Sequence, residues 1–376
     1  MTLTTEKTTT DVVALAAEIG RASAPFEAAH DRDGTFVAEA YAEVRNRGYL
    51  GLAVPSDLGG LGAGTLDVMR AQRELAGWSG STALATTMHH YLTLVQCWRR
   101  DHGAADAEVV LRRIVDEGLV MATSGGSDWV CPTTTATEVE GGYRLDGRKK
   151  FCTQAPAASV ISTSAVLGPP GPDATVLHAG VPLSAPGVSI VETWDTLGMR
   201  GTASHDLVFD GVFLPAEKVM GRRPYGQLTG PLLVAAIHFA PVVGATYLGV
   251  ADGALAEALG VVRGRPSAAP SAVRQLGEMQ ARVRVAWWAL RAAVEEVGPA
   301  FAADEATLLT LMTAKRHAVL EARAVVDTAM DVVGGPAFFR TSPLEQAYRD
   351  VRGGTFHPLT PEATLAALGE AALAAA

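Results

Sequence analysis

Cysteine is scarce in this chain, and its scarcity excludes two kinds of site. Only three of the 376 residues are cysteine, namely Cys97, Cys131 and Cys152. No two of them form a Cys-x-x-Cys pair, so the sequence predicts neither a redox pair nor a cysteine-bound metal. An odd number of widely spaced cysteines fits free thiols in a reducing cytoplasm, which is where we expect the protein.

The chain also has few charged residues and lacks long uninterrupted apolar runs. Charged residues make up 19% of the chain and hydrophobic residues 48%, the balance of an ordinary globular protein. The net charge of −9, without lysine or arginine clusters among aromatics, argues against nucleic-acid binding. The N-terminus lacks a basic start and an apolar run, so we expect no secretory signal. No stretch approaches eighteen apolar residues without a charge or a glycine, so we expect no membrane span.

Helical spacing dominates the first part of the chain, which is long enough for two or three domains. Asp11 is placed to cap a helix whose apolar residues recur every three or four positions, with Pro25 just beyond its end. Three further helices are expected over residues 36–47, 67–76 and 81–99.

The pattern then changes twice. Short alternating runs divided by proline and glycine clusters occupy residues 119–222 and predict an antiparallel β domain, a barrel or a sandwich. Amphipathic segments at 240–262, 271–297 and 304–333, with a last helix beginning at Thr360, predict a four-helix bundle.

The expected fold class is therefore α+β with three domains. Residues 1–119 would form an N-terminal all-α domain, residues 120–225 a middle β domain, and residues 226–376 a C-terminal four-helix bundle.

The stretch from Met121 to Thr153 is the most informative part of the sequence. It begins with a loop of small and hydroxyl residues, 123–128, whose glycines let backbone amides approach a ligand closely. A hairpin follows, with one turn at residues 141–142 and a second at 146–147.

This loop and hairpin, in this order, resemble the acyl-CoA dehydrogenase superfamily. Its middle domain has a Thr-x-Pro-x-Ala-Gly-Ser-Asp type loop followed by a Gly-Tyr-x-Leu-x-Gly-x-Lys-x-(Trp/Phe)-x-Thr hairpin; here the loop is shorter and the hairpin matches almost residue for residue. The resemblance implies a helical, then β, then helical architecture and a flavin cofactor, FAD by family majority with FMN as the alternative. It also implies that Thr123, Ser127, Phe151 and Thr153 contact the flavin, and that Ser127 serves the substrate as well.

Further flavin contacts implied by the resemblance lie later in the chain. Arg200 and Ser204 would reach the flavin or its pyrophosphate. Arg265 corresponds to a family arginine that binds the pyrophosphate, although the family phenylalanine after it is replaced by Ala268. Gly334 and Gly335 correspond to a segment that touches the neighbouring subunit's cofactor, with its glutamine lost. The family expectation is a homotetramer, with a homodimer as the alternative.

The catalytic glutamate of classical acyl-CoA dehydrogenases is missing at both of its family positions. That carboxylate removes the proton α to a thioester carbonyl. In most of the family it lies nine residues after the arginine of an Arg-Asp pair, which counts here from Arg349 to Pro358. In a minority it lies on the first helix of the C-terminal bundle, where this chain has His238 and Phe239, both expected at the substrate.

The segment from Arg349 to Pro358 resembles instead the Arg-x-x-Arg-x-x-Thr-x-His segment of the flavin-dependent monooxygenases of this fold, the dibenzothiophene monooxygenase type. That resemblance implies a catalytic role for His357, and for His89 or His90, because those enzymes carry a histidine on the equivalent helix. A histidine suits proton transfer because its unperturbed pKa of about 6.5 lies near neutral pH.

Three functions remain open on the sequence. The leading one is an oxygen-using monooxygenase or oxidase that works through reduced flavin on a small molecule, with a flavin reductase or electron-transfer partner. The second is an acyl-CoA or acyl-carrier-protein dehydrogenase that acts on a thioester with His357 as its base. The third is a catalytically silent, flavin-binding partner subunit.

Overall fold

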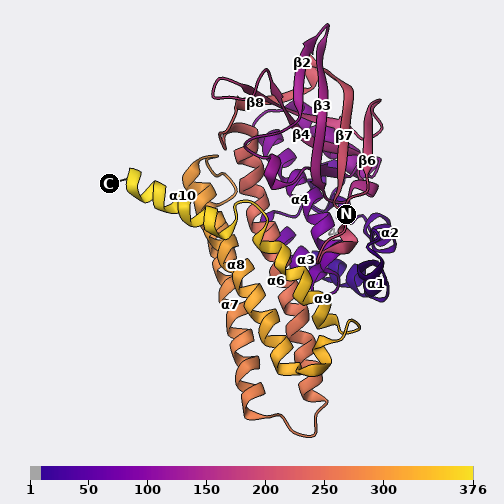
Figure 1. Ribbon diagram of the computed structural model, residues 1–376, viewed down its shortest axis with the longest axis vertical. Coiled ribbons are helices and arrows are strands. Elements are labelled where there is room, and N and C mark those ends of the chain that lie inside the picture. Colours follow the sequence, from indigo (N-terminus) through magenta and orange to yellow (C-terminus); the bar gives the residue numbers. More distant parts are fainter. Residues whose placement is uncertain (1–9, 376) are drawn as a thin grey trace, which may run out of the picture.

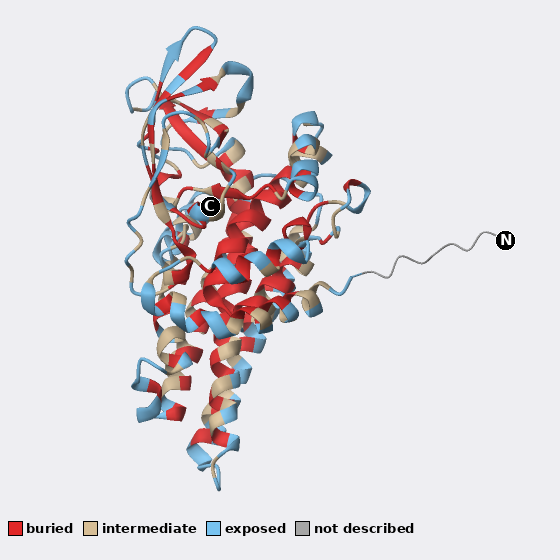
Figure 2. Ribbon diagram, turned by 90° about the vertical axis from the view of Figure 1, so that its right-hand side faces the viewer, coloured by how far each residue is buried: buried red, intermediate tan, exposed pale blue. Residues whose placement is uncertain are grey.

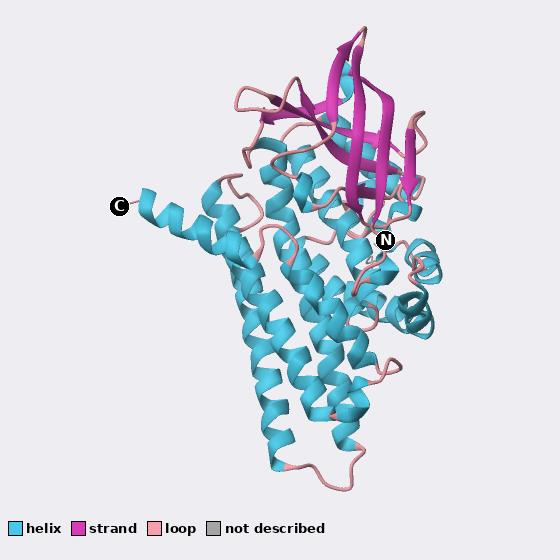
Figure 3. Ribbon diagram, viewed as in Figure 1, coloured by secondary structure: helices cyan, strands magenta, loops and turns pink. Residues whose placement is uncertain are grey.

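The computed structural model describes residues 10–375, apart from the side chain of Ser127. Helices fill the first and last parts of the chain and strands the middle, as predicted. Figure 1 shows the strands at one end of the molecule and the long helices running toward the other, and Figure 3 shows this division by secondary structure. The N-terminal helices are α1 (Val12–Asp33), α2 (Ala38–Asn46), α3 (Thr65–Ala76), α4 (Gly80–Asp101) and α5 (Ala105–Asp116).

The first helix is longer than the sequence predicts. Asp11 caps α1 as expected, because its carboxylate accepts hydrogen bonds from two first-turn amides at 3.0 and 3.1 Å. Pro25 does not end the helix, which runs on to Gly34 with its φ of 66°. The buried face of α1 continues past the proline through Glu27 and Asp31, so packing outweighs the one hydrogen bond that the proline cannot make. The sequence did not reveal α5.

The middle of the chain forms one eight-stranded sheet. Its strands are β1 (Met121–Thr123), β2 (Thr135–Val139), β3 (Gly142–Cys152), β4 (Val160–Leu167), β5 (Thr175–Pro182), β6 (Val188–Val191), β7 (His205–Pro215) and β8 (Val219–Pro224). They follow the order β6-β7-β3-β2-β4-β5-β8, with β1 beside β4. The sequence predicted an antiparallel sheet. The sheet is mixed instead, because β4 pairs in parallel with both β1 and β2.

The predicted second turn of the hairpin does not exist. The first turn, at Gly141, joins β2 to β3, but β3 runs straight through residues 146–147 with a register shift against β7. Gly147 has a φ of 142°, and a Cβ there would lie 2.8 Å from the Cα of Thr134. The Asp-Gly pair therefore marks a β-bulge within a strand, which demands a glycine as a tight turn does.

The C-terminal part is helical. Its helices are α6 (Gly230–Arg263), α7 (Pro270–Val297), α8 (Glu305–Val333), α9 (Pro343–Asp350) and α10 (Pro361–Ala374). The three long helices α6, α7 and α8 pack on one another, and α9 packs on α6 and α8. Thr360 caps α10 as predicted, and Figure 1 shows α10 projecting away from the long helices.

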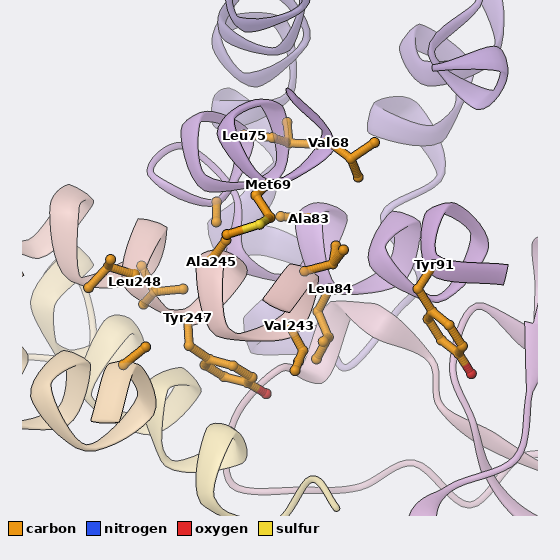
Figure 4. Packing of buried hydrophobic residues seen from close by; sticks show 14 of the residues in the cluster. Val68, Met69, Leu75, Ala83, Leu84, Tyr91, Val243, Ala245, Tyr247 and Leu248 are labelled. Atoms are coloured by element: carbon orange, nitrogen blue, oxygen red, sulfur yellow. The ribbon is translucent and has the colours of Figure 1, made fainter. Parts of the chain in front are cut away.

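Helix α6 is the apolar centre of the helical part. It begins at Gly230 instead of residue 240, and one window of it is apolar enough to cross a membrane, with a mean hydropathy of 1.7. Several glycines interrupt its apolar sequence without ending the helix. In the structure 94% of that window is buried inside the protein. Figure 2 shows buried residues gathered along the middle helices, and Figure 4 shows Met69, Leu84 and Val243 from α3, α4 and α6 meeting there.

Candidate active site

A cavity of about 510 Å³ lies where the sheet, α4, α6 and the segment 349–358 meet. We call it the main cavity. Leu84, Met88 and Tyr91 line it from one face of α4, and Phe239 and Tyr247 line it from α6. Its remaining walls come from loops and strand ends, namely Thr123, Ser124, Gly125, Gly126, Trp129, Phe151, Thr153, Trp194, Thr196, Leu197, Gly198, Met199, Ser204, Arg349, Arg352, Gly353, Phe356, His357 and Pro358. In Figure 4 the hydroxyls of Tyr91 and Tyr247 point away from the packed residues Met69 and Leu75.

On the sheet side, a chain of hydroxyls orients two lining residues. The Thr153 hydroxyl, at the end of β3, lies 2.9 Å from the Ser204 hydroxyl. Ser204 lies 2.8 Å from the hydroxyl of Thr202, which donates to the carbonyl of Met199 at 2.8 Å. Because each hydroxyl both donates and accepts, this chain holds Thr153 and Ser204 in place as hydrogen-bonding groups on the cavity wall.

Aromatic rings form the neighbouring wall. Phe151 has a φ of 57°, uncommon for a residue other than glycine, and its ring is edge-on to Trp194 with centroids 6.0 Å apart. A Cβ on Gly125 would lie 2.6 Å from the Cβ of Phe151, so the loop can pass under this ring only with glycine at that position.

A buried ion pair fixes the shape of the loop. The Lys149 ammonium bonds the Asp128 carboxylate at 2.5 Å, and both side chains are almost fully buried. Asp128 also accepts from the Ser124 hydroxyl at 3.0 Å and from the Thr133 amide at 3.1 Å. Removing either charge would leave the other buried without its partner, so the pair secures a single loop conformation.

His357 lines the main cavity from the C-terminal segment. Its Nε2 lies 2.9 Å from the Tyr247 hydroxyl, and its ring is tilted edge-on to Phe239 with centroids 5.7 Å apart. Burial, with a smaller effect from the charge of Lys315, lowers the pKa of His357 to about 3. The imidazole is therefore neutral at neutral pH, with a lone pair on one ring nitrogen.

Lys315 holds the His357 segment from α8. It is fully buried, and its Nζ donates to the carbonyls of His357, Pro358 and Leu359 at 2.7, 3.3 and 2.7 Å. Burial lowers the pKa of Lys315 to about 7, while three carbonyls satisfy the three protons of its ammonium form. From the other side, a Cβ on Gly126 would lie 2.5 Å from the Cγ of Pro358. The segment is thus fixed between Lys315 and the loop.

No aspartate or glutamate lines the main cavity among the residues that the structure describes. Phe239 and Pro358 do line it, so this cavity includes a residue from each position at which the resemblance places the glutamate, and both residues are apolar. His238 does not line it; its ring packs on Phe301 at 5.3 Å, and its Nε2 is buried without a hydrogen-bond partner in the described part of the chain. The site therefore has no carboxylate to remove a proton α to a carbonyl.

The two histidines of α4 do not line the main cavity, although their neighbour Tyr91 does. His89 accepts from the Met121 amide at 3.2 Å and its Nε2 lies 2.9 Å from the Leu50 carbonyl, so both ring nitrogens join elements of the core. His90 is completely buried, and neither of its nitrogens has a partner among residues 10–375. Burial lowers the pKa of His89 to about 4 and that of His90 well below its usual value.

The arginine predicted at the flavin is engaged elsewhere. Arg200 donates to the carbonyls of Asp31 and Thr196 at 2.7 and 2.8 Å and to the Asp195 carboxylate at 2.9 Å. It is absent from the lining of the main cavity, whereas Ser204, four residues later, is part of it.

Arg265, Gly334 and Gly335 lie together, but not at the main cavity. The Arg265 guanidinium donates to the carbonyls of Val332 and Val333 at 3.0 and 3.2 Å, at the end of α8 where Gly334 follows. The structure thus brings these three predicted residues to one another and not to the other predicted flavin contacts.

Sequence reasoning missed four residues of the site. Tyr247 lies eight residues after Phe239, about 80° around the helix axis and so within one broad stripe of α6, a spacing that could have found it. Lys315 is a lysine within an apolar stripe of α8, which signals a buried partner. Tyr91 was assigned only to the apolar stripe of α4. Trp194 begins a segment that resembles the superfamily, but the segment was assigned mainly to the fold.

The main cavity fits the ring system of a flavin. Phe151 and Trp194 offer aromatic faces, and Thr123, Thr153 and Ser204 offer hydroxyls for polar ring edges. Glycines beside them leave the backbone open to a planar ligand. Ser127 lies in the short turn after Gly125, but its side chain is outside the described part of the structure.

Three family models match the chain. They are the N-terminal domain of acyl-CoA dehydrogenase at residues 8–122, the middle domain at residues 122–212, and the C-terminal domain at residues 241–361.

Curated relatives match over most of their length. The amino sugar nitrososynthase DnmZ of Streptomyces peucetius is 32% identical, over 88% of this chain and 84% of the relative. The putative acyl-CoA dehydrogenase YdbM of Bacillus subtilis is 29% identical, over 93% of each chain. Isobutylamine N-hydroxylase of Streptomyces viridifaciens is 27% identical, over 84% of each chain.

Among solved structures, KijD3 in complex with FMN and dTDP-3-amino-2,3,6-trideoxy-4-keto-3-methyl-D-glucose superposes with a TM-score of 0.85. It is 26% identical and covers 96% of this chain and 93% of that one.

Proposed function

The chain belongs to the acyl-CoA dehydrogenase superfamily and is a flavin-dependent, oxygen-using oxidoreductase, and we propose that it transfers one oxygen atom from O2 to the nitrogen of a primary amine. Relatives named as amino sugar nitrososynthases and as an isobutylamine N-hydroxylase support an amine nitrogen as the acceptor.

One observation carries the proposal: the main cavity holds a neutral His357–Tyr247 pair and has no carboxylate among the described residues. Removal of an α-proton from a thioester needs a base that takes up the proton, and an imidazole with a pKa of about 3 is a poor one at neutral pH. In the tautomer that donates Nε2–H to the Tyr247 hydroxyl, the same neutral imidazole keeps a lone pair on Nδ1 that can accept a hydrogen bond from an N–H group. The cavity thus favours a reaction at nitrogen over a dehydrogenation.

The absence of a carboxylate also selects the protonation state of the amine. An ammonium entering the cavity would lose its hydration without gaining a negative partner, which costs several kcal/mol. A neutral amine avoids that cost, and an N–H donated to His357 would direct its nitrogen lone pair into the cavity. Only the neutral form is a nucleophile, so the site admits the amine in its reactive form.

The overall reaction balances with one two-electron donor. An N–H bond of the amine is replaced by N–OH, the second atom of O2 leaves as water, and reduced flavin, when bound, supplies the two electrons. We assign the flavin ring to the walls formed by Thr123, Phe151, Thr153, Trp194 and Ser204. His357 orients the amine, and Lys315 with Tyr247 holds His357.

The electrons must come from outside this chain if it handles only flavin and an amine. We therefore infer a flavin reductase as partner, as expected from the sequence. FMN, present in the KijD3 complex, and FAD both remain consistent with the cavity. Arg265 and the two glycines at 334–335 lie apart from the main cavity, where they would be available to a neighbouring subunit of a homotetramer.

The pH dependence of substrate use tests this function. If only the neutral amine enters, kcat/KM rises with pH up to the pKa of the free amine, and the midpoint follows that pKa when amines of different basicity are compared. A midpoint that stays fixed across the series would contradict selection of the neutral amine. Reduction of the bound flavin by an acyl thioester without oxygen would instead restore the dehydrogenase function.

A further inference from the structure

A second chamber of about 350 Å³ adjoins the main cavity. The two share Tyr91, Thr123, Ser124 and Trp129 as a common wall. The second chamber extends from this wall between the sheet and the start of α6, whose residues 230–232 line it. The two cavities are therefore direct neighbours across these four residues.

One histidine on the chamber wall has a fixed tautomer. His178, on β5, accepts at Nε2 from the Nε of Arg223 at 3.1 Å. An arginine guanidinium only donates, so Nε2 carries no proton, and the neutral ring must carry its proton on Nδ1. Burial, together with the charges of Arg223 and Lys149, lowers the pKa of His178 to about 3, which keeps the ring neutral.

Among residues 10–375, His178 makes its side-chain hydrogen bond through Nε2 alone, so its Nδ1–H is left without an acceptor there. Ser164 on β4 is its direct cross-strand neighbour, and Ser162 lies two residues before on the same face of β4. All three line the chamber, as does Gln96, whose Oε1 already accepts from Arg99. The polar part of the wall therefore presents a neutral donor at His178 and hydroxyls that can either donate or accept.

Two further features favour an oxygen acceptor here. Helix α6 points its N-terminus at the chamber, and Thr229 makes no side-chain cap to it, so its first amides are left without that partner. The one acidic residue of the lining, Asp128, is already paired with Lys149.

The chamber nevertheless offers no spare positive charge to a doubly charged group. Arg99 is the one lysine or arginine in the described lining, and it makes two bonds to Asp106 at 3.0 and 2.7 Å. The guanidinium of Arg223 donates its hydrogen bonds to backbone carbonyls, including those of Val130 and Gln227 at 3.0 Å. A diphosphate would find its charge uncompensated.

We propose that the second chamber is a substrate subsite for a carbonyl or carboxylate oxygen, that His178 Nδ1–H is its specificity-determining donor, and that nucleotide-linked amines are excluded. The assignment rests on the proposed amine oxygenation only in placing the reactive nitrogen in the main cavity. The substrate is then an amine whose far end carries an amide, a ketone or a single carboxylate.

A matched set of amines tests the subsite. We compare unbranched ω-amino amides, ω-amino acids and plain alkylamines of increasing chain length, with kcat and KM measured separately. At the best length the wild-type protein prefers the amide or the acid over the alkylamine by roughly tenfold in KM, the size of one neutral hydrogen bond. If the wild-type protein shows no such preference at any chain length, the proposal is overturned, whether or not the variants fold.

Variants at His178 identify the donor. His178→Leu, which cannot donate, should lose the roughly tenfold preference, and His178→Asn, which can donate from a similar position, should retain most of it. His317→Leu, on α8 outside both cavities, is the matched control. An equal loss for all three kinds of amine in His178→Leu would mean a structural role and would overturn the assignment.

Binding without turnover separates this inference from the proposed function. Hexanamide, which has no amine to oxidise, is titrated into flavin-loaded wild type and the two His178 variants by saturation-transfer NMR. Binding that is lost in His178→Leu and kept in His178→Asn supports the subsite even if no amine is oxidised. If amines are oxidised but hexanamide binds all three proteins alike, the subsite fails and the proposed function stands. Tight binding of dTDP to the wild type would overturn the exclusion of nucleotides.

Discussion

The protein places histidines near the loop of residues 123–128 in two regions, and their surroundings differ. His89 and His90 lie on the long buried helix α4. Both ring nitrogens of His89 are bonded to core groups, and neither nitrogen of His90 is bonded to a residue that the structure describes. His357 lies in a short segment between helices, lines the main cavity, and is paired with Tyr247. The comparison teaches that a catalytic assignment depends on which face of an element a residue occupies, because adjacent residues on a helix point about 100° apart.

The largest effect is expected at His357. His357→Ala removes the acceptor that orients the amine, so turnover should fall roughly 10²- to 10⁴-fold while the flavin stays bound. Steady-state oxidation of a primary amine and flavin content of the purified variant measure the two quantities. Turnover within a factor of two of the wild type would remove His357 from the mechanism.

A smaller loss of turnover is expected from a substitution where the loop contacts the His357 segment. Gly126→Ala would place a Cβ 2.5 Å from the Cγ of Pro358 and push the segment away from the loop. Displacement of a positioning segment by a fraction of an ångström to an ångström lowers turnover by roughly ten- to a hundredfold. Gly171→Ala, at an open position, is the control and should leave turnover unchanged. Equal behaviour of the two variants would show that the loop does not position His357.

Lys315 should make the stability of the folded protein depend on pH. Its pKa of about 7 in the folded protein lies below the value of about 10.4 in an unfolded chain, so the unfolded state binds more protons between these two pH values. This residue therefore makes the folded state more stable as pH rises from 7 to about 10. Lys315→Met should lose that rise, and near pH 7 it should cost about 1–3 kcal/mol for the carbonyls left unpaired. Thermal-unfolding midpoints of both proteins across this range provide the test, and parallel curves would contradict it.

The smallest effect is expected at His90. Both of its nitrogens are buried without partners in the described part of the chain, so His90→Leu removes polar atoms that are costly to bury and should change stability by less than about 1 kcal/mol, with turnover retained. Turnover and the thermal midpoint are measured together. A loss of turnover comparable to that of His357→Ala would return His90 to the active site.

Periodicity in the sequence predicted the order of helices and strands but not their interruptions. Pro25 and the glycines of α6 interrupt an apolar pattern without ending a helix, since packing of the buried face exceeds the cost of the hydrogen bond lost at the proline and of the backbone entropy lost at the glycines. Gly147 shows the converse case. A dipeptide typical of a tight turn serves a bulge in a continuous strand, and only the pairing of β3 with β7 distinguishes the two.

Site residues that belong to a sequence motif could be predicted. Site residues whose role depends on neighbours that are distant in the sequence could not. Thr123, Phe151, Thr153 and His357 were named from motifs and all line the main cavity. The fixed tautomer of His178 was out of reach, because it depends on a bond to a residue forty-five positions away on another strand.

The central claim is that an oxygen atom of O2 reaches an amine nitrogen in the main cavity. The direct test mixes the flavin-loaded, reduced protein with a primary amine under ¹⁸O2 and examines the product by mass spectrometry. The account predicts an N-oxygenated product carrying ¹⁸O from the gas, made by the wild type and nearly absent with His357→Ala. Formation of hydrogen peroxide alone, with no labelled product from any amine, would contradict it.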